Sequence, residues 1–206
     1  MQRKEVGILI FPDVEVLDFT GPFEVFSATR LDESKRRQEP SPFVVSILAQ
    51  GKEPVAASGG LQVIPHLSLE ECPRLDILVV PGGWGVRREI HNPTLIRWIE
   101  AQGRTVDTLA SVCTGAMLLG QAGLLAGRRA TTHWRSLQWM EESFPNVKVE
   151  PDLHVVEDGK VITSAGISAG IDMALCVVAR YFGEGVSRAT ARHMEYPYPE
   201  NLSRRR

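Results

Sequence analysis

Apolar residues in this chain gather in short continuous runs that are separated by polar or amphipathic stretches. The runs Val6–Phe11, Phe43–Ala49 and Asp76–Val80 are rich in β-branched residues, and each is followed directly by turn-forming residues. Runs of this kind are typical of strands that are buried on both faces of a sheet. A fourth run, Thr105–Val112, leads directly into Cys113. The pattern therefore predicts several buried parallel strands.

Helices are expected between these strands. One begins at about Pro22 and continues through ATRLDE, and a second runs from Asn92 to Gln102. Asn92 is the expected N-cap of the second helix, with Pro93 at its first helical position. Three more helices are expected over Thr114–Leu125, Trp134–Phe144 and Ser168–Gly183. The chain thus predicts strands and helices in alternation.

Two hairpins complete the predicted elements. The segment KEPVAASGGLQVIP carries a Gly-Gly turn, and HVVEDGKVIT turns at Asp158-Gly159, a strong short hairpin signal. A short strand is expected at Arg129–Thr132. Strands that alternate with helices indicate an α/β fold whose mainly parallel sheet is covered on both faces. Because no internal repeat or linker is visible, residues 1–206 are interpreted as a single domain.

Three chemically notable positions fall at the carboxyl ends of predicted strands. Asp18 follows the first strand, the PGGWG segment follows the third, and Cys113 follows the next. Ligands of open parallel sheets bind at this edge. We therefore expect these positions to form one site.

Cys113 lies between a predicted strand and a predicted helix, in the sequence ASVCTGAMLLG. A side chain at such a turn projects toward the ligand crevice, as in a nucleophile elbow. The amides and dipole of the following helix are expected to favour the thiolate and to lower the thiol pKa. A second interpretation stays open at this point, that of a buried structural cysteine. Cys72 lies in a polar loop and Cys176 in an apolar helix, and neither has an activating neighbour.

Gly82 and Gly83 form a tight turn after a strand, and we expect them to leave backbone N–H groups bare beside the elbow. Such groups can bind an anion or a developing negative charge. The string GGWG lacks the G-x-G-x-x-G spacing of a dinucleotide site, so no nucleotide cofactor is expected. The five histidines show no HxxxH or HExxH spacing, and no metal is expected.

Composition and charge exclude several classes of protein. The formal net charge of −2 gives no general attraction to nucleic acid or to anionic membranes. No apolar stretch approaches the roughly 20 residues of a membrane span, and the N-terminus does not resemble a signal peptide. Three cysteines without a CxxC pair argue against a disulfide framework and for a reducing compartment. We expect a cytoplasmic protein.

Four motifs resemble the DJ-1/PfpI superfamily, also called ThiJ/PfpI, over about residues 5–195. They are LDFTGPFEVF, DILVVPGGWG, ASVCTGAMLLGQAGLLAGRRATTHW and ITSAGISAGIDMAL. Within that superfamily they are most similar to isonitrile hydratases and to the amidase-like domains of AraC-type regulators. The resemblance implies a flavodoxin-like three-layer sandwich, a reactive cysteine at the elbow, and a homodimer.

The resemblance also assigns roles to individual residues. Cys113 matches the reactive cysteine, and Asp18 matches the acidic residue that faces the thiol. Thr114 matches the hydratase pattern, whereas peptidase-like and many glyoxalase-like members have a histidine there. His133 matches a histidine that is often near the cysteine, and we assign it to the substrate pocket with Gly82 and Gly83. Without the resemblance, Asp18 would be interpreted as a helix-capping residue.

The leading hypothesis is an isonitrile hydratase-like lyase that acts on a small molecule. In it the Cys113 thiolate attacks the isonitrile carbon, Asp18 protonates that carbon, and water oriented by Thr114 releases an N-substituted formamide. A ligand-binding or redox sensor and a glyoxalase- or deglycase-like stress protein are the alternatives. AraC-type regulators carry a C-terminal helix-turn-helix, but this chain ends at NLSRRR. We therefore expect no DNA binding, and a solvated tail at residues 204–206.

Overall fold

A seven-stranded sheet forms the centre of the protein in the computed structural model, which describes residues 2–203. In spatial order, its strands are β10 (Val155–Asp158), β11 (Val161–Ser164), β7 (Thr108–Val112), β6 (Ile77–Val80), β1 (Lys4–Leu9), β2 (Phe43–Ala49) and β5 (Leu67–Ser68). All neighbouring strands are parallel except β10 and β11, which form an antiparallel hairpin. The predicted α/β fold with a mainly parallel sheet is confirmed.

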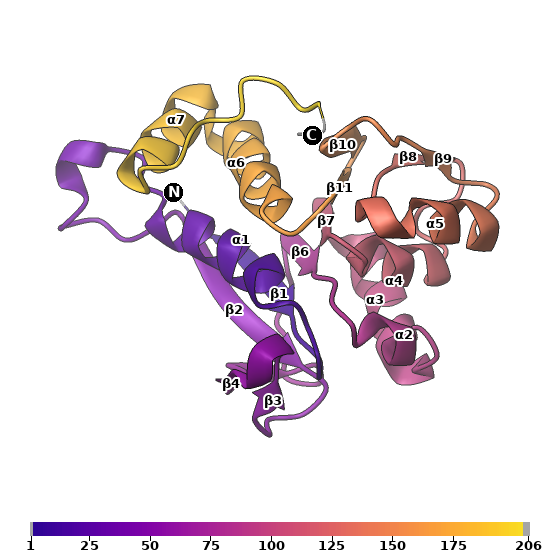
Figure 1. Ribbon diagram of the computed structural model, residues 1–206. Coiled ribbons are helices and arrows are strands. Elements are labelled where there is room, and N and C mark those ends of the chain that lie inside the picture. Colours follow the sequence, from indigo (N-terminus) through magenta and orange to yellow (C-terminus); the bar gives the residue numbers. More distant parts are fainter. Residues whose placement is uncertain (1, 204–206) are drawn as a thin grey trace.

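Helices cover both faces of this sheet (Figure 1). One side carries α1 (Val16–Ala28), α6 (Ala169–Phe182) and α7 (Glu184–His193). The other side carries α2 (Val86–Glu89), α3 (Pro93–Thr105) and α4 (Gly115–Gln121), and α5 (Leu137–Ser143) lies beyond them. The result is the flavodoxin-like three-layer sandwich that the sequence analysis expected.

Short elements connect the main layers. They are β3 (Val55–Ala56), β4 (Gln62–Val63), β8 (Arg129–Ala130), β9 (Lys148–Val149) and the 3₁₀ turns η1 (Glu33–Lys35), η2 (Ser58–Gly60) and η3 (Trp134–Ser136). The two hairpins that were expected are present, as β3 with β4 and as β10 with β11. Within residues 2–203, no helix has the length and apolarity that a membrane crossing requires. The expected solvated tail at residues 204–206 lies outside the described part of the chain.

The central strands are apolar because helices cover them on both sides. All four residues of β6 are fully buried. A strand that is buried on both faces has no side that faces solvent, so polar residues do not alternate with apolar ones along it. This explains the continuous apolar runs in the sequence. These strands therefore hold their carboxyl ends, and the loops that follow, in fixed positions.

Helix α1 begins at Val16, six residues before the expected start at Pro22. Proline inside a helix removes one hydrogen bond, here the one to the carbonyl of Asp18, but it does not end a helix that packing holds in place. Phe19 and Phe26 are buried on this helix and provide that packing. As a consequence, Asp18 lies in the first turn of α1, within the helix and not in a turn before it.

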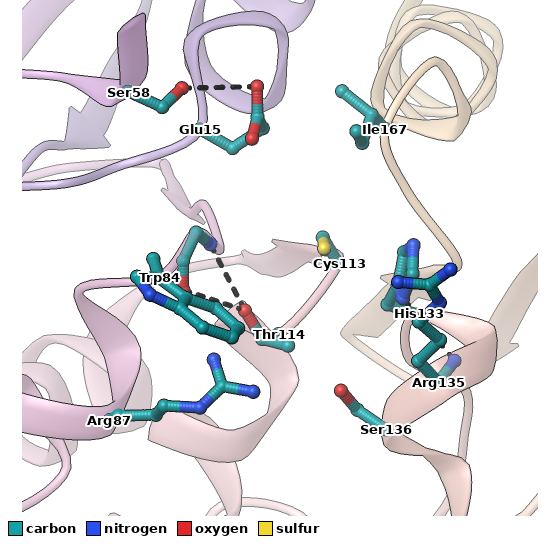
Figure 2. A pocket seen from close by; sticks show the side chains of 11 residues that line it. Glu15, Ser58, Trp84, Arg87, Cys113, Thr114, His133, Arg135, Ser136 and Ile167 are labelled. Carbon is teal, nitrogen blue, oxygen red and sulfur yellow. Dashed lines mark hydrogen bonds between the residues drawn. The ribbon is translucent and has the colours of Figure 1, made fainter. Parts of the chain in front are cut away.

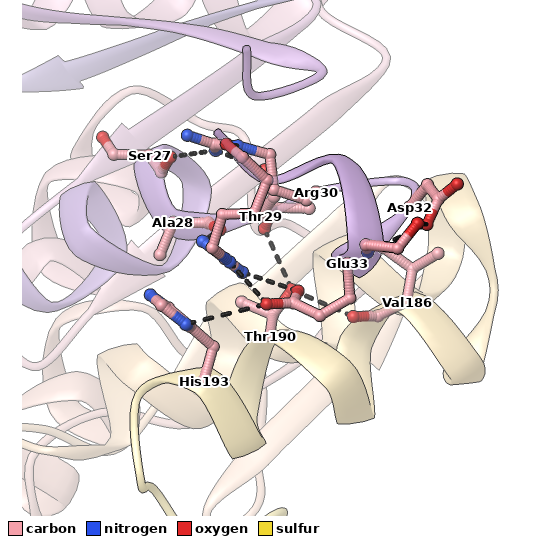
Figure 3. A network of polar contacts seen from close by, with 11 residues as sticks. Ser27, Ala28, Thr29, Arg30, Asp32, Glu33, Val186, Thr190 and His193 are labelled. Carbon is pink, nitrogen blue, oxygen red and sulfur yellow. Dashed lines mark hydrogen bonds and ion pairs between the residues drawn. The ribbon is translucent and has the colours of Figure 1, made fainter. Parts of the chain in front are cut away.

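Polar contacts hold the segment after α1 against α7 (Figure 3). Glu33 accepts hydrogen bonds from Arg36, and its carboxylate lies 3.7 Å from His193 Nδ1. Buried Thr190 Oγ1 lies 3.4 Å from Thr29 Oγ1. The helix α7 was not predicted, because the expected elements ended with the helix over Ser168–Gly183. These contacts and its packing on α6 explain why it forms.

Candidate active site

Cys113 directly follows β7 and has a positive φ of 57°, as a nucleophile elbow requires. This conformation costs a non-glycine residue about 1–2 kcal/mol. Two hydrogen bonds stabilise it: the Cys113 N–H donates to Ser164 O at 3.0 Å, and Thr132 Oγ1 donates to Cys113 O at 2.8 Å. The thiol is therefore held in one position at the carboxyl end of the sheet.

Two glycines allow neighbouring loops to approach the elbow closely. A Cβ atom on Gly82 would lie 2.5 Å from Thr114 N and 2.9 Å from Cys113 Cβ. A Cβ atom on Gly166, whose φ is 106°, would lie 2.6 Å from Cys113 Cβ. Neither place has room for a side chain. The loops after β6 and β11 thus confine Cys113 from two directions.

Asp18 lies behind the elbow and is fully buried. Its Oδ2 accepts a hydrogen bond from Gly82 N–H at 3.0 Å, and its Oδ1 accepts none of ordinary geometry from residues 2–203. Burial raises the pKa of Asp18 to about 8, and the negative charge of Glu15 adds to this effect. The Gly82 amide and the nearby Cys113 thiol act in the opposite direction, but they offset only part of this rise in the pKa of Asp18. At neutral pH, Asp18 is therefore mostly a neutral carboxylic acid.

The pKa of the Cys113 thiol is raised, which corrects the expectation that the helix would lower it. Burial is the largest cause, since the residue is only 7% exposed, and the charge of Asp18 is the next. The amide and hydroxyl of Thr114 favour the thiolate but do not offset these effects. Two buried acids that repel each other when ionised keep their protons to higher pH. The protonation of Cys113 and that of Asp18 therefore depend on each other.

The amides of Gly82 and Gly83 are not bare, so that expectation was also wrong. Gly82 N–H donates to Asp18, and Gly83 N–H donates to Thr114 Oγ1 at 3.0 Å. Thr114 Oγ1 in turn lies 3.3 Å from Gly83 O, to which it can donate. The two amides orient Asp18 and Thr114 and do not form an oxyanion hole.

Replacement of Thr114 with valine is expected to lower the thermal stability of the protein. Valine has nearly the same shape but removes the acceptor of the part-buried Gly83 N–H, and a hydrogen bond of this kind contributes about 0.5–1.5 kcal/mol. For a domain of this size, the melting temperature should fall by roughly 2–4 °C per kcal/mol. Thermal unfolding followed by circular dichroism measures the change, and Thr114→Ser, which keeps the hydroxyl, is the matched control. Equal melting temperatures for both variants would contradict the assigned role.

A pocket of about 370 Å³ opens beside Cys113 (Figure 2). It is lined by Glu15, Ser58, Gly83, Trp84, Arg87, Cys113, Thr114, His133, Arg135, Ser136 and Ile167. Its volume lies within the range that is typical of small-molecule sites. Of the residues expected at the site, Cys113, Thr114, Gly83 and His133 face the pocket. Asp18 and Gly82 lie behind this lining.

His133 begins the turn η3, where its Nδ1 accepts a hydrogen bond from Arg135 N–H at 3.3 Å. Its ring lines the pocket opposite Trp84, with Cys113 between them (Figure 2). His133 therefore lines the same pocket as Cys113. No group of three or more histidine, cysteine, aspartate or glutamate side chains within residues 2–203 is arranged to hold a metal ion.

Sequence reasoning missed the charged part of the lining. Glu15, Arg87 and Arg135 belong to no chemical motif and come from three separate segments. Their only signal in the sequence is proximity to residues that were singled out. Arg87 follows the PGGWG segment, and Arg135 is two residues after His133.

Comparison with known proteins identifies the family. The model of the DJ-1/PfpI family matches residues 4–180. An isonitrile hydratase of Pseudomonas putida is 36% identical over 194 residues, which are 93% of this chain and 78% of that protein. The HTH-type transcriptional regulator CdhR of Pseudomonas aeruginosa is 38% identical over 66% of this chain, but the match covers only 40% of the regulator.

Solved structures agree with this result. The crystal structure of a ThiJ/PfpI family protein from Pseudomonas syringae superposes with a TM-score of 0.84 and 29% identity. The superposition covers 98% of this chain and 78% of that one. The family model that matches most of the chain and the 36% identity to the hydratase show that this chain belongs to the DJ-1/PfpI family.

Proposed function

We propose that this protein is an isonitrile hydratase, a lyase that adds water to an isonitrile and forms an N-substituted formamide. The observation that carries the proposal is the pairing of Cys113, on the pocket wall, with the buried carboxyl group of Asp18 directly behind it. An isonitrile carbon needs both a soft nucleophile and a proton. The similarity to the hydratase of Pseudomonas putida supports the same activity.

The proposed reaction begins when the pair has lost one of its two protons. The remaining proton stays on the thiol, because a thiol has a higher ordinary pKa than a carboxyl group and burial raises the pKa of Cys113 as well as that of Asp18. The Asp18 carboxylate takes this proton as the Cys113 sulfur forms a bond to the isonitrile carbon, and then donates it to the same carbon. The product is a thioimidate, in which the sulfur–hydrogen bond of Cys113 has been added across the carbon. Asp18 is again a carboxylate.

Water completes the proposed cycle. Its oxygen bonds to the thioimidate carbon, one of its protons goes to Asp18, and the nitrogen is protonated from the same carboxyl group. The carbon–sulfur bond then breaks, the hydroxyl proton returns to the sulfur, and the formamide leaves. Thr114, whose hydroxyl is held at Gly83, faces the pocket where this water would enter.

A sensor of the same family is the second candidate. The similarity to a transcriptional regulator supports it, as does a cysteine that faces a small-molecule pocket without a histidine next to it. A glyoxalase- or deglycase-like function is less well supported, because Thr114 occupies the position where many such members carry histidine. Sensor and enzyme differ in whether the ligand is converted.

Turnover of a simple isonitrile tests the proposal directly. The purified protein is incubated with benzyl isocyanide, and N-benzylformamide is measured by liquid chromatography and mass spectrometry. Catalytic formation of the formamide is expected. If the folded protein, with an alkylatable Cys113, converts no isonitrile, the hydratase proposal is wrong and the sensor is favoured.

We further propose that the protein is a cytoplasmic homodimer. The location rests on the cysteine pattern, which favours a reducing compartment, and the dimer rests on the family resemblance. Multi-angle light scattering at micromolar concentration should give about twice the 22.8 kDa mass of one chain. A single species with the mass of one chain would refute the dimer.

A further inference from the structure

Two arginines of the pocket lining are each stacked on an exposed tryptophan. The Arg87 guanidinium lies 3.7 Å from the centre of the Trp84 ring, and that of Arg135 lies 4.7 Å from the centre of the Trp134 ring. Figure 2 shows Arg87 and Arg135 on opposite sides of the pocket, with Cys113 between and beyond them. Trp84 is 72% exposed and Trp134 58%, so neither ring is part of the core.

Neither guanidinium has an acidic partner in the described part of the chain. The ion pairs formed by residues 2–203 include neither Arg87 nor Arg135. Arg88, by contrast, pairs with Glu89 and Asp13 outside the pocket. Glu15 is the acidic member of the lining, and it contacts Ser58 Oγ at 3.2 Å on a third side of the pocket.

Stacking leaves the binding edge of each guanidinium free. An aromatic ring contacts the flat face of the group, while the N–H donors point outward in its plane. The ring also restricts the side chain, so that less conformational entropy is lost when an anion binds. A planar carboxylate matches these donors in a bidentate arrangement. The two arginines are thus prepared to bind an anionic group.

The floor of the pocket does not oppose an anion at neutral pH. Asp18 is mostly neutral there, and Cys113 is a thiol. The lining then carries two positive charges from Arg87 and Arg135 and one negative charge from Glu15. A ligand whose reactive end reaches Cys113 would place its other end near the arginines.

We infer that Arg87 and Arg135 form a carboxylate-binding subsite, and that the substrate is an isonitrile whose nitrogen substituent carries a carboxylate group. The identity of the reacting group rests on the proposed function, whereas the subsite itself does not. The isonitrile carbon contacts Cys113, and the carboxylate lies between the two guanidinium groups. A neutral substrate of the same size lacks this second contact.

Alkylation of Cys113 tests the subsite without requiring turnover. Iodoacetate carries a carboxylate and iodoacetamide is its neutral analogue, so the ratio of their rates reports on attraction of the anion. In Arg87→Gln/Arg135→Gln, this ratio is expected to fall by about threefold to tenfold. High salt should reduce the difference between wild type and variant. Arg97→Gln, which removes an exposed charge on α3 outside the pocket, is the matched control and should keep the wild-type ratio.

Isonitriles of matched shape test the substrate class. Wild type is expected to convert 4-isocyanobenzoate with a higher kcat/KM than methyl 4-isocyanobenzoate, and the double variant should lose this preference mainly through KM. Suppose that benzyl isocyanide is converted, but that the double variant keeps both the wild-type alkylation ratio and the preference for 4-isocyanobenzoate over its methyl ester. The subsite is then refuted. If the alkylation ratio falls as expected while no isonitrile is converted, the subsite stands and the hydratase proposal fails.

Discussion

Replacement of Cys113 with alanine is expected to abolish formamide formation from isonitriles. The proposed reaction passes through a covalent bond between Cys113 and the isonitrile carbon, and no other thiol lines the pocket. Removal of a covalent nucleophile costs roughly a thousandfold or more in kcat. The measurement is formamide production by wild type and Cys113→Ala at equal concentration, with circular dichroism to confirm that both are folded.

Cys72 provides a matched control for this experiment. It is a half-buried thiol outside the pocket, and burial raises its pKa to about 11. Cys72→Ala should retain wild-type kcat within about twofold, because surface substitutions away from special features have small effects. Turnover that survives in folded Cys113→Ala would eliminate the thioimidate route, whatever the effect at Cys72.

Elements of the fold could be predicted where buried positions produce a clear pattern of apolar residues in the sequence, or where a capping residue marks a helix end. The apolar run Phe43–Ala49 is strand β2 without any change of boundary, and Asn92 caps α3 through Leu95 N–H as its sequence position indicated. The start of α1 was not predictable from local signals. Pro22 normally marks a first turn, and only packing of α1 on the rest of the molecule places it inside the helix.

The residue types of the site could be predicted, but not its electrostatics. Asp18, Gly82 and Cys113 converge because β1, β6 and β7 are neighbours whose carboxyl ends share one edge. The direction of the Cys113 pKa shift depends on how deeply the pair is buried, which strand spacing does not reveal. The hydrogen bond from Gly82 N–H to Asp18, which removes the expected oxyanion hole, joins residues 64 positions apart. Such contacts follow from tertiary structure alone.

Replacement of Asp18 with asparagine is expected to slow formamide formation by about a hundredfold or more, the scale of a general acid–base contribution. Asparagine keeps an oxygen for the Gly82 amide but cannot accept and return the thiol proton. In wild type, the rate should rise as the pH passes about 8, where the pair loses its first proton. This rise should be absent in Asp18→Asn. A variant with wild-type kcat would show that another group transfers the proton.

The same replacement should have the opposite effect on alkylation. The charge of Asp18 raises the pKa of the Cys113 thiol, so its removal lowers that pKa and increases the thiolate fraction. At pH 8–9, iodoacetamide should therefore modify Cys113 faster in Asp18→Asn than in wild type, as measured by peptide mass spectrometry. Slower hydration together with faster alkylation separates loss of the proton-transfer group from loss of the pocket. If both rates fall, the pocket has been disturbed.

Asp18→Asn should also change how stability depends on pH. The carboxyl group has a pKa of about 8 in the folded protein and an ordinary value of 3.8, so between these values the folded state binds more protons than the unfolded state. The free energy of unfolding of wild type therefore falls as pH rises through this window, by up to about 1.4 kcal/mol per pH unit from this group. The variant lacks this contribution, so its melting temperature relative to wild type should be higher at pH 8 than at pH 5. A difference in melting temperature that is the same at both pH values would mean that Asp18 is ionised at neutral pH.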